Sequence, residues 1–176
     1  MSALRWTEEF RTVYAAAKKS YGQGADSPDA MFDSEAKAFL SSIGCSPREL
    51  FDLVEDGCRF GEPDFATSLE LADIRRDYFL NTQKGVASVH PIDMDRLPPK
   101  SARLAGIRWL PRIIEKARAK LRGEMPEELM YCCGGDRDFL RGAGMTAAEF
   151  LRLVRDCGDD TERVVAAVVQ KAGRRA

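Results

Sequence analysis

Residues 39–56, FLSSIGCSPRELFDLVED, return one hundred residues later as FLRGAGMTAAEFLRLVRD at residues 139–156. Seven of the eighteen aligned positions are identical. A duplicated segment of this kind predicts two copies of one supersecondary unit, each of which buries its apolar face against a neighbour. The repeat therefore predicts much of the architecture before any single residue is assigned a role.

Each copy has the pattern of two helices joined by a tight corner. Ser34 is placed to cap the first helix of the earlier copy, and Gly44 and Gly144 are placed to end the helices before the two corners. The segments Ser46–Glu49 and Thr146–Glu149 then carry the Ser/Thr-x-x-Glu spacing of a capping box. We expect a new helix to start at each box.

Helical periodicity continues before and after these corners. In each copy, a further amphipathic helix precedes the two helices that the corner joins. The first of these starts at a Thr7 cap, and the second has Pro111 in its first turn. A further helix closes each copy, over about Pro63–Thr82 in the first and, capped by Asp160, over Thr161–Ala172 in the second. Each copy therefore contains four predicted helices.

The predicted fold is all-α, with about eight helices and no convincing strand. Two pseudo-equivalent four-helix units are expected at residues 1–83 and 106–176, packed as one helical domain. The connecting segment, residues 84–105, contains three prolines and few periodic residues. Since this is long for a structureless connection, we expect it to pack across the bundle or pass near a site.

Composition indicates a soluble globular protein, with 44% hydrophobic and 31% charged residues in a chain of 176. No apolar run approaches the roughly 20 residues that a membrane helix needs, and the N-terminus lacks a basic-then-apolar signal. The five cysteines are odd in number and suggest no disulfide framework. We therefore expect a cytoplasmic protein with reduced thiols, no membrane partner, no metal and no cofactor.

Charge is unevenly distributed although the net charge is −1. Residues 1–100 carry 12 Lys and Arg against 17 Asp and Glu, while residues 101–176 carry 15 against 11. The second half could attract an anionic partner, or the two halves could simply attract each other.

Two features could carry thiol chemistry. Cys132 and Cys133 are adjacent, a spacing that does not suit one tetrahedral zinc. One of them could be a thiolate favoured by nearby basic residues and by a helix N-terminus at Asp136, or both could be small buried packing residues. His90, the only histidine, is either a partner for such a thiol or a polar loop residue beside a proline.

A basic segment follows the connecting region and contains a single acid, Glu115, among eight cations: Lys100, Arg103, Arg108, Arg112, Lys116, Arg118, Lys120 and Arg122. A helical wheel places Arg112 and Lys116 roughly opposite the apolar stripe. The segment is either a solvated helix face or a site for a phosphate or carboxylate. Nucleic-acid binding is disfavoured, because the chain is not basic overall and the helix lacks interleaved exposed aromatic residues.

The polar candidates differ between the copies. Positions 112, 116 and 133 are Arg, Lys and Cys, whereas positions 12, 16 and 33 are Thr, Ala and Asp; only Arg118 keeps a cation, Lys18. The fold alone therefore does not demand these residues, and a site is expected in the second copy.

The segment Leu110–Arg118, LPRIIEKAR, followed by Tyr131–Leu140, YCCGGDRDFL, resembles a bacterial family known as domain of unknown function 5069. The resemblance covers about Leu97–Val169. The family's pattern falls on Arg112, Lys116, Arg118, Tyr131, Cys133 and Asp136. The chain departs from it at Gly134–Gly135, where members often have Pro-Leu, and this loosens the loop that carries Cys133. The resemblance implies no particular activity.

Three functions are compatible with these residues. The first is binding of a small anionic ligand in a pocket between the copies, by Arg112, Lys116, Arg118, Tyr131 and Asp136, with Cys133 in the lining. The second is an enzyme that uses Cys133 as nucleophile or redox thiol, activated by the same cations or by His90. The third is a helical scaffold for protein interactions.

Overall fold

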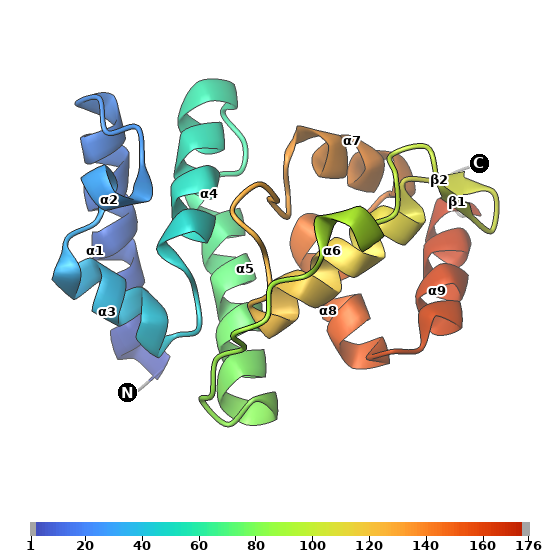
Figure 1. Ribbon diagram of the computed structural model, residues 1–176. Helices are drawn as coiled ribbons and strands as arrows, with labels where there is room; N and C mark the ends of the chain where they lie inside the picture. Colours follow the sequence, from blue (N-terminus) through green and yellow to red (C-terminus); the bar gives the residue numbers. More distant parts are fainter. Residues whose placement is uncertain (1–2, 174–176) are drawn as a thin grey trace. The chain divides into compact units, whose positions relative to one another are not determined.

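The computed structural model describes residues 3–173 and confirms the all-α prediction. Helices account for 67% of the chain and strands for 2%. Nine α-helices lie within the described residues (Figure 1), and none of them is both long and apolar enough to cross a bilayer. The chain divides into two compact units, Met1–Gly85 and Val86–Ala176, hereafter the first and second unit.

The first unit contains α1 (Ala3–Gly22), α2 (Pro28–Met31), α3 (Ser34–Ser42), α4 (Pro47–Phe60) and α5 (Phe65–Asp77), followed by a π-helical turn, Tyr78–Thr82. Helix α1 packs against α4, and the short α2 packs against both. The core is rich in aromatic and aliphatic side chains, among them Trp6, Phe10, Tyr14, Phe39, Leu40, Ile43, Phe51 and Val54.

The second unit starts with a 3-10 turn, Met94–Arg96, and a hairpin of β1 (Arg103–Leu104) and β2 (Ile107–Arg108). Four helices follow: α6 (Leu110–Arg122), α7 (Gly134–Ala143), α8 (Ala147–Cys157) and α9 (Thr161–Gly173). Helix α6 packs against α8, and α9 packs against α7 and α8. Apolar side chains from all four helices are buried, including Ile113, Ile114, Leu140, Phe150, Leu151, Val154, Val164 and Val168.

Both predicted corners are present and have the same local geometry. Gly44 and Gly144 adopt left-handed φ values of 72° and 71°. Both capping boxes form. The side chains of Ser46 and Thr146 accept hydrogen bonds from the backbone N–H three residues on, and the side chains of Glu49 and Glu149 accept from the backbone N–H of the cap residues. The two corners show only that short segments share a geometry, so duplication of the complete four-helix unit remains a prediction.

Several helix ends differ from the sequence-based boundaries. Helix α1 already includes Trp6, ahead of the expected Thr7 cap, and this places the Trp6 side chain in the core. Asp33, rather than Ser34, caps α3 by accepting a hydrogen bond from the backbone N–H of Ala36. The predicted Asp160 cap is confirmed by its bond from the N–H of Arg163.

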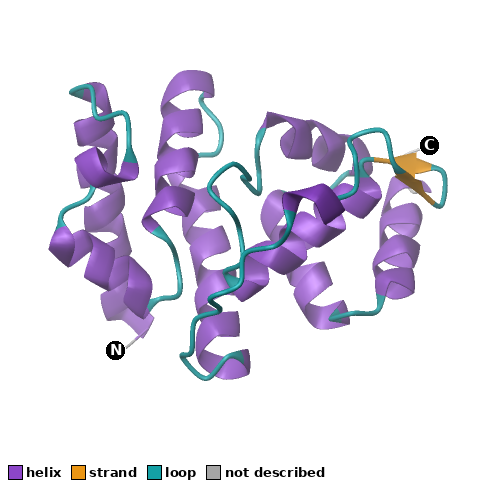
Figure 2. Cartoon of the chain, in the orientation of Figure 1, coloured by secondary structure: helices purple, strands orange, loops and turns teal. Residues whose placement is uncertain are grey.

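The hairpin was not predicted, and its size explains why. Each strand contains two residues, too few to show the alternation that identifies a strand. Ala105 and Gly106 form the turn with positive φ values of 51° and 77°. The described strands are confined to this hairpin, as Figure 2 shows.

Asp52 on α4 is expected to make stability depend on pH. Burial raises the pKa of its carboxyl to about 6, although the Arg48 guanidinium 2.8 Å away opposes the shift. Since the folded state then holds the proton more tightly than the unfolded state, the free energy of unfolding falls as pH rises from about 4 to about 6.

Asp52→Asn should therefore stabilise the protein at pH 7.5 by about 1 kcal/mol, after allowance for residual solvent contact and for the lost pairing with Arg48. Urea unfolding at about pH 4.5 and pH 7.5, followed by circular dichroism, measures the effect. The exposed Asp73→Asn on α5 is the control. An equal gain at both pH values would contradict this role for Asp52.

Candidate reactive-cysteine site

Lys116 is buried in the second unit, with 2% of its surface exposed. Its side chain forms an ion pair with Asp136, which is fully buried. The helical wheel, which placed Lys116 opposite the apolar stripe, was therefore wrong about its environment. The reason is tertiary: the start of α7 brings a carboxylate to this face of α6, and the pairing offsets the cost of burying the ammonium.

Asp136 is the centre of a buried hydrogen-bond network. Its Oδ1 accepts a 2.9 Å bond from Nε1 of Trp109, and its Oδ2 accepts a 3.0 Å bond from the backbone N–H of Cys132. The Lys116 ammonium also donates to Oδ2. With three donors around one carboxylate, the buried charge is well compensated.

Cys133 lies beside this network, at the N-cap position of α7. Its Sγ is 3.3 Å from the Lys116 Nζ, and the residue is half-buried. The Cys133 side chain makes no capping hydrogen bond to α7. An ammonium and the positive end of a helix dipole both favour a thiolate over a thiol. The site thus combines a half-buried cysteine with two features that activate cysteines.

The backbone around the site is strained at two positions. Trp109 and Cys132 have φ values of 75° and 72°, in the left-handed region that residues with a Cβ rarely adopt. Such strain costs on the order of 1–3 kcal/mol per residue and is concentrated at functional sites. Both residues donate hydrogen bonds to Asp136, so the strained positions support the network directly.

Gly135 allows Trp109 to reach its place. A Cβ built at Gly135 would lie 2.7 Å from a carbon of the Trp109 ring, closer than atoms tolerate. Gly135, one of the two glycines at which the chain departs from the pattern of the resembled family, therefore has a packing role: it lets an indole lie against the first turn of α7.

The predicted site residues only partly converge. Lys116, Cys133 and Asp136 lie together. Arg112 donates a 2.8 Å bond to the carbonyl of Pro98, and Arg118 donates to Glu115, Thr161 and the carbonyl of Gly158. These two arginines thus fasten α6 to neighbouring segments of the second unit.

Tyr131 and His90 also have other surroundings. The Tyr131 hydroxyl is buried and donates a 2.8 Å bond to the carbonyl of Ala147, and burial holds its pKa well above the usual value. His90 is exposed in the connecting segment, where its backbone N–H donates to Ser88 Oγ. The structure places the Lys116 ammonium beside the Cys133 sulfur.

The remaining cysteines differ from Cys133 in accessibility. Cys45, Cys132 and Cys157 are buried, and burial raises the pKa of Cys132 to about 12. Cys58 on α4 is exposed and therefore provides an internal reference thiol.

Within residues 3–173, no three His, Cys, Asp or Glu side chains are grouped in a way that would hold a metal ion.

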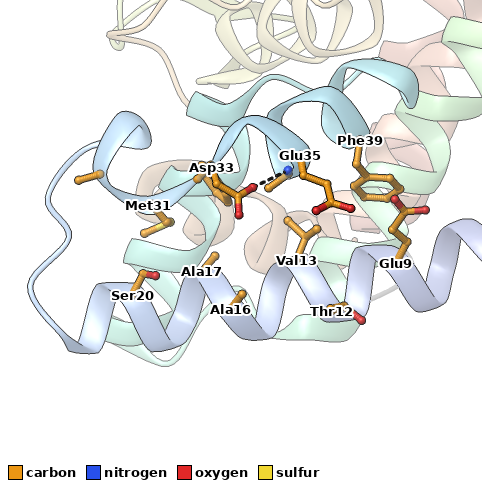
Figure 3. A pocket seen from close by; sticks show the side chains of 13 residues that line it. Glu9, Thr12, Val13, Ala16, Ala17, Ser20, Met31, Asp33, Glu35 and Phe39 are labelled. Carbon is orange, nitrogen blue, oxygen red and sulfur yellow. Dashed lines mark hydrogen bonds between the residues drawn. The ribbon is translucent and has the colours of Figure 1, made fainter.

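The first unit contains a surface hollow of about 490 Å³ between α1, α2 and α3. Figure 3 shows the carboxylates of Glu9, Asp33 and Glu35 around it, with Val13, Ala17, Met31 and Phe39 among the apolar lining. The lining includes no Lys or Arg and none of the predicted site residues. Its charge does not suit the anionic ligand expected from the sequence.

Sequence reasoning overlooked two residues at the site, Trp109 and Arg137. Trp109 directly precedes the LPR motif, and Arg137 directly follows Asp136. Neither shows a periodic or motif signal of its own. Their positions depend on the left-handed turn at Trp109 and on the path of the chain into α7, which become visible only in the folded structure.

Comparison with known proteins identifies one family. Residues 96–176 match the model of a family described as Domain of unknown function (DUF5069). This region includes Trp109, Lys116, Cys133 and Asp136, and it lies in the second unit. No curated protein and no solved structure matches the chain.

Proposed function

We propose that the second unit uses Cys133 as a thiolate nucleophile toward a small electrophile. The observation that carries the proposal is the 3.3 Å contact between the Lys116 Nζ and the Cys133 Sγ at the head of α7. Reactive cysteines occur in this setting, with a cation and a helix N-terminus beside a partly accessible sulfur.

The chemistry follows from the charges at the site. The Cys133 thiol loses its proton to solvent, and the sulfur then attacks an electrophilic carbon. An S–C bond forms as the bond to the leaving group breaks, and the leaving group departs with that electron pair. Lys116, which is paired with the Asp136 carboxylate, places its positive charge beside the sulfur and stabilises the anionic form.

A purely structural role explains the cluster less well. Buried ion pairs contribute little net stability compared with apolar residues of similar volume, because both charges must be desolvated. One hundred residues earlier, the positions of Lys116 and Asp136 hold Ala16 and Ala36, at the corresponding places on α1 and α3. A helical unit can thus be built without the pair, which supports a chemical reason for retaining it.

The proposal is tested by alkylation of the native protein with iodoacetamide, resolved for Cys133 and Cys58 by mass spectrometry of peptides. We expect the ratio of the Cys133 rate to the Cys58 rate to be about tenfold higher near pH 7 than near pH 10, because an activated thiol gains most over an ordinary one at neutral pH. The two thiols differ in accessibility, but this difference affects the rate ratio equally at both pH values and so does not alter its change with pH. A rate ratio that does not vary with pH would refute the proposal that Cys133 is an activated nucleophile.

A further inference from the structure

We propose that the surface hollow of the first unit binds a linear aliphatic amine, whose ammonium groups pair with its carboxylates and whose alkyl chain lies on its apolar wall. The hollow is formed by α1, α2 and α3, which all belong to the first unit. It lies outside residues 96–176, and the proposal does not depend on the chemistry of Cys133.

The lining of the hollow contains the positions that stand one hundred residues before the Cys133 site. Asp33 is the N-cap of α3, and Cys133 is the N-cap of α7. Ala16 on α1 stands one hundred residues before Lys116 on α6. In the second unit, the long Lys116 side chain is buried and its ammonium meets a carboxylate. In the first unit, the short Ala16 side chain instead lines a hollow of about 490 Å³.

The carboxylates around the hollow have no cation of their own. Those of Glu9, Asp33 and Glu35 surround it (Figure 3), and among residues 3–173 no ion pair involves any of the three. Negative charges gathered around one concave surface attract a cation. An ammonium from outside the chain would supply here the kind of charge that Lys116 supplies within the second unit.

A metal ion does not suit this arrangement. Calcium and magnesium need several oxygen ligands converging on one point. Within residues 3–173, no three carboxylate, His or Cys side chains are grouped closely enough for that. A flexible chain with an ammonium at each end can instead pair with carboxylates that lie apart.

The apolar part of the lining suits the alkyl chain of such an amine. Val13, Ala17, Met31 and Phe39 contribute to it, as Figure 3 shows. The volume lies within the range of roughly 300–1,000 Å³ that small-molecule pockets occupy. Covering these side chains with methylene groups removes apolar surface from water and adds to the attraction between the charges.

Titration of ¹⁵N-labelled protein with 1,6-diaminohexane and with 1,6-hexanediol tests the proposal, since the two compounds have the same chain length and differ in charge. Near pH 7 and in low salt, we expect the diamine to half-saturate the amide shifts of α1, α2 and α3 at about 1 mM, at least about tenfold below the diol. Equal half-saturation by the two compounds, or diamine shifts spread over acidic residues of both units, would overturn the proposal.

Ala16→Lys and Ala15→Lys form a matched pair, because each adds one lysine at an exposed alanine of α1. Ala16 lines the hollow, whereas Ala15 is outside its lining. Ala16→Lys brings a competing ammonium to the hollow and should weaken diamine binding at least about tenfold, and Ala15→Lys should weaken it less than about threefold. Equal weakening by both would show that the diamine responds only to the charge of the helix.

Asp33→Asn and Asp29→Asn provide a second pair. Asparagine caps a helix as well as aspartate does, so Asp33→Asn removes the charge and keeps the start of α3. Asp29 is exposed, pairs with Lys37 and is outside the lining. Diamine binding should weaken about fivefold in Asp33→Asn and less than about twofold in Asp29→Asn. Binding that is unaffected by Asp33→Asn would contradict recognition of the ammonium in this hollow.

Discussion

Asp136→Ala is expected to lower the free energy of unfolding of the second unit by about 3–5 kcal/mol. The substitution leaves the buried Lys116 ammonium without its counter-ion and removes the acceptor for Trp109 Nε1 and for the Cys132 backbone N–H. It also removes the bonds that help to hold Trp109 and Cys132 in strained conformations. Urea unfolding followed by Trp109 fluorescence, in a Trp6→Phe background, reports on the second unit.

Asp138→Ala is the control, because it removes a carboxylate from the same helix at an exposed position. Its ion pair with Arg141 is largely solvated, so the loss should stay within about 0.5 kcal/mol. Similar losses of unfolding free energy for the two variants would contradict the stabilising role of the buried Asp136 network.

Lys116→Met should be nearly as damaging as Asp136→Ala, at about 3–5 kcal/mol, because it leaves a buried carboxylate without its cation. Methionine keeps the length of the aliphatic stem, so lost packing contributes little. The same unfolding experiment measures the loss. A loss below about 1 kcal/mol would contradict the buried pairing of Lys116.

The double variant Lys116→Met/Asp136→Asn should recover at least about 2 kcal/mol relative to Lys116→Met alone. Both charges are then absent, and the amide oxygen introduced at position 136 can still accept one bond from Trp109 or from the Cys132 backbone. A double variant as unstable as the sum of the single losses would show that the two residues do not act as a pair.

The corners of the fold were predictable because they are local. Each depends on a glycine with positive φ followed within five residues by a capping box, and both the glycine and the box are visible in the sequence. The amphipathic helices were predictable for the same reason: Phe10, Tyr14 and Ala17 recur at helical spacing and are buried as expected. Helix starts were less accurate, because Asp33 and Ser34 can both serve as caps.

The candidate site was predictable only as a set of residues. Cys133, Lys116 and Asp136 were all chosen from the sequence, yet the wheel put Lys116 on the outer face of α6. A wheel considers one helix, whereas the burial of Lys116 depends on a carboxylate twenty residues later. Arg112 and Arg118 were grouped with Lys116 by charge, but their bonds lead to other segments.

The most direct test of the central claim, that Lys116 and Asp136 serve the Cys133 thiolate, is alkylation of the double variant Lys116→Met/Asp136→Asn. In the native protein, the ratio of the Cys133 to the Cys58 iodoacetamide rate should fall about tenfold between about pH 7 and pH 10. In the folded double variant, we expect the ratio to vary less than about twofold over the same range. A double variant that retains the full tenfold change would contradict the activation of Cys133 by Lys116.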